Sequence, residues 1–178
     1  MGRSDFAVTA RRETRLRQTE RHAEGYLELG MPQAALDVLA QAGSPTDLSA
    51  YGCYLQGEAF RALQRYGEAV APLRKAAASE PDSIHVWLAL GWCYKRSGRL
   101  DLAIAAIRQA LAVEPAEALL HYNLACYLSL SGQKRPALEH LSRAFVLDPD
   151  YRRMVDSEPD FDPIRSDPQF QALTGTTA

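Results

Sequence analysis

The chain has 178 residues, a length that suits one domain, and 47% of them are hydrophobic, as in ordinary soluble globular proteins. Its formal net charge of −2 gives no general attraction to nucleic acid or to an anionic membrane, so neither is an expected partner. The N-terminus has no apolar leader and the chain has no apolar run of spanning length, which predicts a cytoplasmic protein without membrane insertion.

Residues 1–15 are predicted to form a basic, partly helical N-terminal extension. Residues 1 to about 8 carry no periodic pattern, so we expect them to be frayed or extended. From Thr9 to Arg21 helix formers dominate and large apolar residues are scarce, which indicates a solvated helix. This stretch lacks the interleaved aromatic residues typical of nucleic-acid binding. Its arginines are Arg11, Arg12, Arg15, Arg17 and Arg21.

From residue 16 to residue 151 the sequence repeats with a period of 34 residues, which gives repeats at 16–49, 50–83, 84–117 and 118–151. The pattern predicts pairs of antiparallel helices, because small residues allow two helices to cross closely while large apolar ones fill the space beside the crossing. Small residues recur on the first helix at Ala23, Gly57, Gly91 and Ala125, and on the second at Ala35, Ala69, Ala103 and Ala137. Large ones recur at Leu39, Leu73, Ile107 and Leu141.

The connections between paired helices differ in sequence. Gly30-Met31-Pro32 is a plausible turn with proline opening the second helix, and Ser97-Gly98-Arg99 is a tight turn. The second repeat has Gln64 where a turn glycine is usual, so we expect its connection to be shaped differently. Gly43 is the expected C-terminal cap of the second helix.

The third repeat, residues 84–117, carries a complete motif of tryptophan, leucine-glycine and tyrosine, followed by alanine, a large apolar residue and proline. Its members are Trp87, Leu90, Gly91, Tyr94, Ala103, Ile107, Ala110 and Pro115. The motif resembles that of the tetratricopeptide repeat (TPR) family, with Ile107 in the phenylalanine position. The resemblance implies an all-α fold, a right-handed TPR superhelix (α-solenoid) of three clear repeats plus one degenerate N-terminal repeat, that binds other proteins.

Residues 152–173 resemble the segment that closes many bacterial TPR arrays. The part that carries the resemblance runs Glu158-Pro159-Asp160-Phe161-Asp162-Pro163-Ile164-Arg165 and then Ser166 to Leu173. This predicts a C-terminal helical cap, with a last helix capped by Ser166 or Asp167 and Pro168 in its first turn. Residues 174–178 are an expected disordered tail. The residues expected to cover the open face of the fourth repeat are Met154, Val155, Phe161, Ile164, Phe170 and Leu173.

Catalytic motifs are missing from the sequence: it has no glycine-rich phosphate loop, zinc-protease motif or nucleophile elbow. We therefore expect no enzyme, no catalytic residue, no cofactor and no metal site. Cys53, Cys93 and Cys126 lack C-x-x-C spacing and are expected as small core or groove residues. His22 and His121 fall in core positions of the repeat, which favours packed or hydrogen-bonded histidines.

Binding is the function that the resemblance implies, since TPR first helices line a concave groove. Aromatic residues in groove positions without a packing role are typical interface anchors, and here these include Tyr54, Trp92 and Tyr122. We expect a peptide or helix from an unidentified protein partner to be held by Tyr51, Tyr54, Glu58, Arg61, His85, Leu88, Trp92, Lys95, Tyr122 and Cys126.

Three alternatives stay open. The chain can be a self-assembling structural protein, a homo-oligomer; it can resemble the TPR chaperones of secretion systems; or its own terminal segment can fill the groove. Chaperone-tail recognition is disfavoured, because the positions of the family's lysine, arginine and asparagine clamp hold other residues, namely Glu20, Glu24, Leu55, His85 and Ala89.

Overall fold

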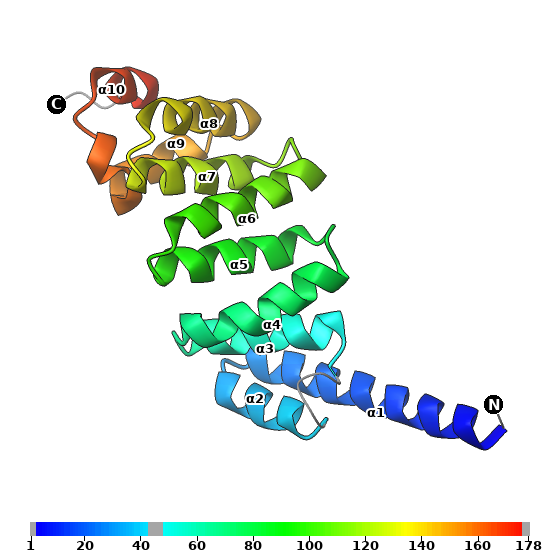
Figure 1. Ribbon diagram of the computed structural model, residues 1–178. Coiled ribbons are helices and arrows are strands. Elements are labelled where there is room, and N and C mark those ends of the chain that lie inside the picture. Colours follow the sequence, from blue (N-terminus) through cyan, green and yellow to red (C-terminus); the bar gives the residue numbers. More distant parts are fainter. Residues whose placement is uncertain (1–2, 43–47, 176–178) are drawn as a thin grey trace. The chain divides into compact units, whose positions relative to one another are not determined.

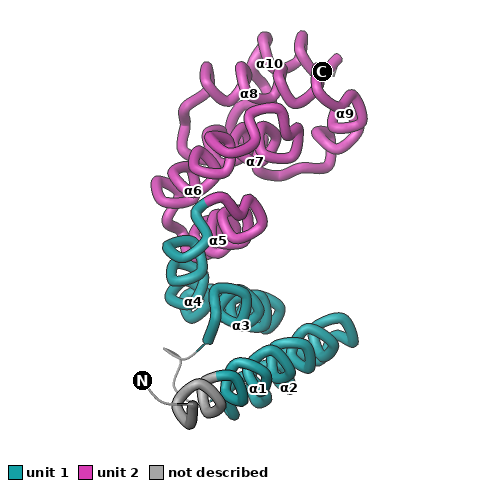
Figure 2. Tube along the Cα trace, turned by 90° about the vertical axis from the view of Figure 1, so that its right-hand side faces the viewer, with its two compact units in different colours: residues 1–81 teal, residues 82–178 magenta. Residues whose placement is uncertain are grey.

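The structure is a computed structural model that describes residues 3–42 and 48–175. Throughout those residues the regular elements are helices, which confirms the all-α class. The chain divides into two compact units, unit 1 (residues 1–81) and unit 2 (residues 82–178), coloured separately in Figure 2.

Unit 1 contains two antiparallel helical pairs, α1 with α2 and α3 with α4, and α1 and α2 both pack on α3. Helix α1 extends well past α2 (Figure 1). It begins at Arg3, so the expectation that residues up to 8 are frayed or extended is wrong for the described part; no glycine or proline interrupts the helix between Arg3 and Gly25. The helices span Arg3–Glu28 (α1), Pro32–Ala40 (α2), Ala50–Ala62 (α3) and Tyr66–Ser79 (α4).

Unit 2 contains two further pairs, α5 with α6 and α7 with α8, followed by the cap. Helix α6 packs on α7, the 3-10 segment η3 packs on α7, and α10 lies against α8 (Figure 1). The helices span Ile84–Arg96 (α5), Leu100–Val113 (α6), Ala118–Leu130 (α7) and Lys134–Leu147 (α8). The cap comprises Tyr151–Met154 (α9), Val155–Ser157 (η2), Pro159–Ile164 (η3) and Pro168–Thr174 (α10).

The crossings of paired helices are built from small residues, as the repeat pattern predicts. The eight alanines and glycines named for the crossings are all buried. At Gly57 an added Cβ would lie 2.4 Å from Cγ of Leu73, and at Gly91 it would lie 2.9 Å from Cδ1 of Ile107. The neighbour that excludes a side chain is therefore the large apolar residue of the second helix, packed directly over the glycine.

The turns inside the repeats share one geometry. Gly30, Gly98 and Gly132 have φ of 69°, 71° and 74°, and Gln64 has φ of 58° at the same place in its repeat. Each turn also has the same hydrogen bond across it; Arg65 N donates to Phe60 O at 2.9 Å, as Arg99 N does to Tyr94 O. The expectation of a differently shaped connection at Gln64 is wrong, because helix packing imposes the left-handed turn on glutamine.

The cap follows the sequence closely. Asp167 accepts hydrogen bonds from Gln169 N at 2.8 Å and Phe170 N at 3.4 Å, with Pro168 in the first turn of α10. Val155, Phe161, Ile164 and Phe170 are buried. Met154 was expected to be covered but is 51% exposed.

The last helix extends into the predicted tail. Thr174 was assigned to a disordered tail but is the last residue of α10, and Gly175 caps that helix with φ of 77°. The rest of the tail, residues 176–178, and the predicted cap Gly43 lie outside the described residues.

Candidate functional site

The largest cluster of polar and aromatic groups on a first helix of unit 1 is a surface that we call the tyrosine patch: Glu24, Tyr51, Tyr54, Glu58 and Arg61. The last four follow each other at helical spacing along one face of α3, and none of them is among its buried residues. The rings of Tyr51 and Tyr54 stack with centroids 6.4 Å apart and an interplanar angle of 26°. Tyr51 is 39% exposed. The patch is thus an open aromatic surface bordered by charged groups.

Hydrogen bonds hold both ends of the patch. Tyr51 Oη donates to Glu24 Oε1 at 2.5 Å, which joins α3 to α1. At the other end Arg61 binds Glu58 through two hydrogen bonds of 2.9 and 2.6 Å. Burial, and then the hydrogen bond to Glu24, raise the pKa of Tyr51; burial, and then Glu58, raise the pKa of Tyr54. Both rings therefore present neutral phenols at physiological pH.

Glu20 of α1 holds the first turn of α3 next to the patch. Its side chain is buried, and Oε1 accepts from Ser49 N at 3.3 Å and from Ser49 Oγ at 2.6 Å. Ser49 Oγ in turn accepts from Gly52 N at 3.1 Å and so caps α3. A carboxylate beside a helix N-terminus is favoured by the helix dipole. This arrangement fixes α1 against the first turn of α3.

In unit 2 four of the predicted binding residues, all on α5, are at least partly exposed. Trp92 is 38% exposed, His85 is exposed, and Leu88 is partly exposed. Lys95 is instead committed to internal contacts: it forms an ion pair with Asp160 of η3, and its ammonium lies 5.1 Å from the Trp92 ring centroid. The described surface of α5 therefore offers a tryptophan whose nearest cation is already paired.

Tyr122 and Cys126 do not lie on an open surface. They are 4% and 2% exposed, because the cap covers this face of α7. The Tyr122 ring meets Phe161 edge-on, with centroids 5.6 Å apart at 80°, and lies 4.8 Å from the Tyr151 ring. The expectation of Tyr122 as an exposed anchor is therefore wrong. The alternative in which a terminal segment covers the groove positions holds for this part of unit 2.

The sequence pattern did not predict two of these contacts, that of Asp160 with Lys95 and that of Glu24 with Tyr51. It placed the cap at the open end of the fourth repeat and did not connect Asp160 with Lys95, although a conspicuous acidic-aromatic dipeptide, Asp160-Phe161, faces a lysine and a tyrosine in groove positions. It also left Glu24 out of the binding set, although Glu24 occupies a groove position of the first repeat beside Tyr51.

The histidines divide into an exposed and a paired group. His22, which the repeat pattern predicts to be packed or hydrogen-bonded, is exposed. His121 and His140 meet with their Nδ1 atoms 2.9 Å apart, and His121 Nε2 lies 3.0 Å from Pro115 O. A carbonyl oxygen only accepts, so His121 carries its proton on Nε2, and His140 Nδ1–H donates to His121 Nδ1. Burial, then His121 and Arg108, lower the pKa of His140.

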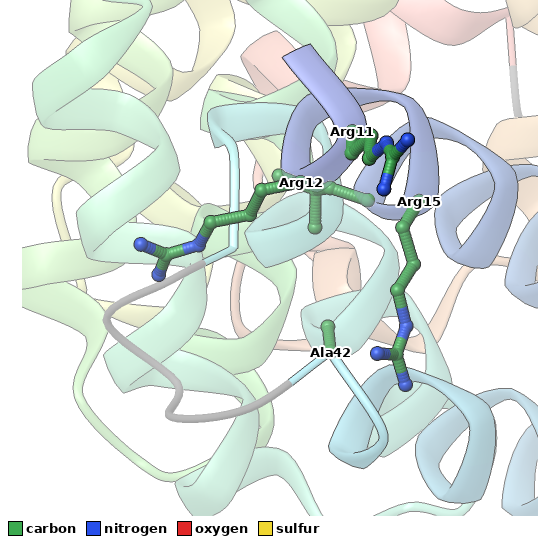
Figure 3. A pocket seen from close by; sticks show the side chains of 5 residues that line it. Arg11, Arg12, Arg15 and Ala42 are labelled. Carbon is green, nitrogen blue, oxygen red and sulfur yellow. The ribbon is translucent and has the colours of Figure 1, made fainter. Parts of the chain in front are cut away.

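The arginine-rich part of α1 borders a pocket of about 340 Å³ that is also lined by Leu16 and Ala42. In Figure 3 Arg12 extends to the left and Arg15 downward, so their guanidinium groups lie apart. Because the guanidinium groups do not converge on one point, the geometry does not favour an anion site.

Metal and membrane chemistry find no support in the described residues. Within residues 3–42 and 48–175 there is no cluster of three or more potential metal ligands, and no helix there is both long and apolar enough to cross a bilayer. Cys53, Cys93 and Cys126 are free and buried, and burial raises the pKa of the Cys126 thiol.

Comparison with known proteins gives a family-model match over part of the chain, one partial relative and several solved structures of similar fold. Residues 60–125 match the family model described as tetratricopeptide repeat. Protein bimA from Emericella nidulans is 32% identical over 71 residues, which is 40% of this chain and only 9% of that protein, so the chain spans a small part of its relative.

Solved structures share the fold at low identity. The crystal structure of MamA matches with a TM-score of 0.70 at 19% identity, over 78% of this chain and 81% of that one. MamA 41-end from Desulfovibrio magneticus RS-1 matches with 0.69 at 20%, over 90% and 94%. YrrB, a TPR protein with an unusual peptide-binding site, matches with 0.69 at 21%, over 76% and 70%. Residues 60–125 thus match the tetratricopeptide repeat family, and the chain shares the fold of solved TPR structures.

Proposed function

We propose that this chain is a non-catalytic interaction module that binds a peptide or helix of a protein partner, with the tyrosine patch as its principal site. The observation that carries the proposal is the stacked pair of exposed Tyr51 and half-buried Tyr54 on a first helix of the repeat array. Tyrosine offers a large rigid contact area that loses little conformational entropy on binding, which suits an interface anchor.

The cap supports the choice of the patch. It covers Tyr122 and Cys126 and pairs with Lys95, so these predicted binding residues already have partners inside unit 2. Tyr51, Tyr54, Glu58 and Arg61 keep exposed surface. Trp92, His85 and Leu88 form a second, smaller surface on α5. YrrB, which shares the fold, is itself a peptide-binding TPR protein.

A capture experiment with matched variants tests the patch. Wild type, Tyr51→Ala/Tyr54→Ala and the control Leu29→Ala/Met31→Ala, which removes exposed apolar side chains elsewhere in unit 1, are incubated with lysate and compared by quantitative mass spectrometry. We expect a partner that the wild type and the control retain and the tyrosine variant loses, while all three keep the same helical circular dichroism. Equal capture by all three would place binding outside the patch.

Self-assembly is the second candidate. It is favoured by exposed apolar side chains, with Leu29 74%, Met31 48% and Val146 71% exposed. Light scattering over a concentration series separates the candidates: a mass that stays at 19.7 kDa excludes the homo-oligomer, and a rising mass that Leu29→Ala/Met31→Ala or Val146→Ala suppresses supports it.

A further inference from the structure

We propose that the tyrosine patch receives a lysine or arginine side chain of the bound peptide, at the end formed by Glu24, Tyr51 and Tyr54. This inference rests on the proposed function and specifies the chemistry of the partner. It follows from the charge of the patch, from how aromatic rings elsewhere in the chain are used, and from the position of Arg61.

The Glu24 end of the patch carries negative charge that no ion pair among the described residues neutralises. Glu24 receives its hydrogen bond from the neutral hydroxyl of Tyr51, and Glu20, one helical turn earlier, receives its bonds from the neutral groups of Ser49. Among the described residues neither carboxylate forms an ion pair, although Arg17 and Arg21 lie within one turn. Two carboxylates thus stand beside the tyrosines without a cation.

Within the described part of the chain several other aromatic rings are covered by a cation, whereas Tyr51 and Tyr54 are not. Among the described residues cations lie over several rings: Arg65 over Phe60 at 4.7 Å, Arg99 over Tyr94 at 5.4 Å, Arg152 over Phe145 at 4.6 Å, and Lys95 over Trp92 at 5.1 Å and over Tyr127 at 5.7 Å. Across residues 10–42 and 48–175 no such cation covers Tyr51 or Tyr54. Cations bind aromatic faces through the ring quadrupole, and a nearby carboxylate adds to the attraction. The end of the patch formed by Glu24, Tyr51 and Tyr54 supplies both groups, and Arg61 is bonded to Glu58 at the other end.

The two ends of the patch differ in charge. Arg61 and Glu58 neutralise each other through their two hydrogen bonds at the C-terminal end of the patch. Glu24 lies at the opposite end, against Tyr51. A basic side chain is therefore attracted to the Glu24 end, whereas the paired Arg61 and Glu58 at the other end offer it no net negative charge, which orients the peptide along α3.

The test first selects a peptide ligand and then replaces Glu24 by glutamine, which removes the negative charge and keeps the size of the side chain. Short random peptides are displayed to the full chain, and peptides that also bind Tyr51→Ala/Tyr54→Ala are discarded. The dissociation constant of the most enriched peptide is measured by fluorescence anisotropy for wild type, Glu24→Gln and the control Glu13→Gln, which loses the same charge from an exposed position of α1 outside the patch. Glutamine keeps an oxygen that accepts from Tyr51.

We expect the enriched peptides to share a lysine or arginine, Glu24→Gln to weaken binding about five- to tenfold, and Glu13→Gln to leave it unchanged. Replacing the shared basic residue of the peptide by glutamine should weaken binding by a similar factor, and the double change should add little. Peptides that need the tyrosines but share no basic residue, with equal affinity for Glu24→Gln, would overturn this inference and leave the proposed function standing. Failure to find any tyrosine-dependent peptide would overturn both.

Discussion

Gln64 is, within the described residues, the one non-glycine residue with a positive φ. A side chain in the left-handed region is strained, whereas glycine adopts it freely, as at the equivalent positions 30, 98 and 132. The side chain is exposed, so its removal costs no buried contact.

We expect Gln64→Gly to raise the free energy of unfolding by about 1 kcal/mol, less the entropy that glycine adds to the unfolded chain. Urea denaturation followed by circular dichroism measures it. Gln64→Ala is the control, since it shortens the side chain without relieving the backbone. Equal stability of the two variants would show that the left-handed turn carries no strain.

Gly57 tests the packing at a helix crossing. An added methyl group would lie 2.4 Å from Leu73, so Gly57→Ala must displace a fully buried leucine and should cost about 1–3 kcal/mol. Gly67 also lies in a helix but has no atom within 4 Å of an added Cβ, so Gly67→Ala should stabilise by about 0.5–1 kcal/mol. Chemical denaturation of the two variants should give changes of opposite sign. A stabilising Gly57→Ala would contradict the close crossing.

At the scale of the element, the cap behaves as part of the core of unit 2. Phe161 is fully buried between Tyr122 and Phe170, with ring centroids 5.6 and 5.7 Å away. Phe161→Ala should therefore lower the free energy of unfolding by about 3–5 kcal/mol. Met154→Ala, in the same cap but 51% exposed, should change it by less than about 0.5 kcal/mol. Similar thermal unfolding of the two variants would show that the cap is not part of the cooperative core.

The histidine pair between α7 and α8 links the stability of unit 2 to pH. The pKa of His140 is lowered in the folded chain, first by burial and then by His121 and Arg108, with Glu139 opposing. The unfolded state then binds the proton more readily, so stability is full above the ordinary histidine pKa of about 6.5 and decreases as pH falls below it.

His140→Gln should flatten that decrease, measured as the unfolding free energy between about pH 7.5 and pH 5. The exposed His22→Gln is the control and should keep the wild-type slope. A His140→Gln variant with an unchanged slope would assign the pH dependence to other groups.

At the scale of the whole molecule, the three thiols report on the integrity of the chain. Cys53, Cys93 and Cys126 are at most 2% exposed and lie in both units. Titration with Ellman's reagent should find them slow to react in the folded chain and all three reactive in denaturant, because an inaccessible thiol cannot attack the reagent. Rapid reaction of one cysteine alone would locate a unit that opens by itself.

The sequence predicted the repeat period, the small residues at the crossings, and most of the cap, because these depend on local spacing and on volumes that must fit. It failed where tertiary contacts decide. The left-handed turn at Gln64 is set by the packing of its two helices, and the burial of Tyr122 depends on a segment that is distant in sequence. Of the predicted binding residues, whether Tyr51, Tyr54, Glu58 and Arg61 bind a partner stays a prediction.

The cap also limits how many repeats this array can hold. Its Asp160 pairs with Lys95, which belongs to the third repeat, while its Phe161 packs on Tyr122 of the fourth. Duplicating residues 118–151 would preserve the tyrosine but put Ser129 in the position of Lys95, since the two are one period of 34 residues apart. A buried carboxylate would then face a hydroxyl instead of an ammonium group. The closing segment therefore fits this particular pair of repeats, and a lengthened array would need a matching lysine before it could end in the same way.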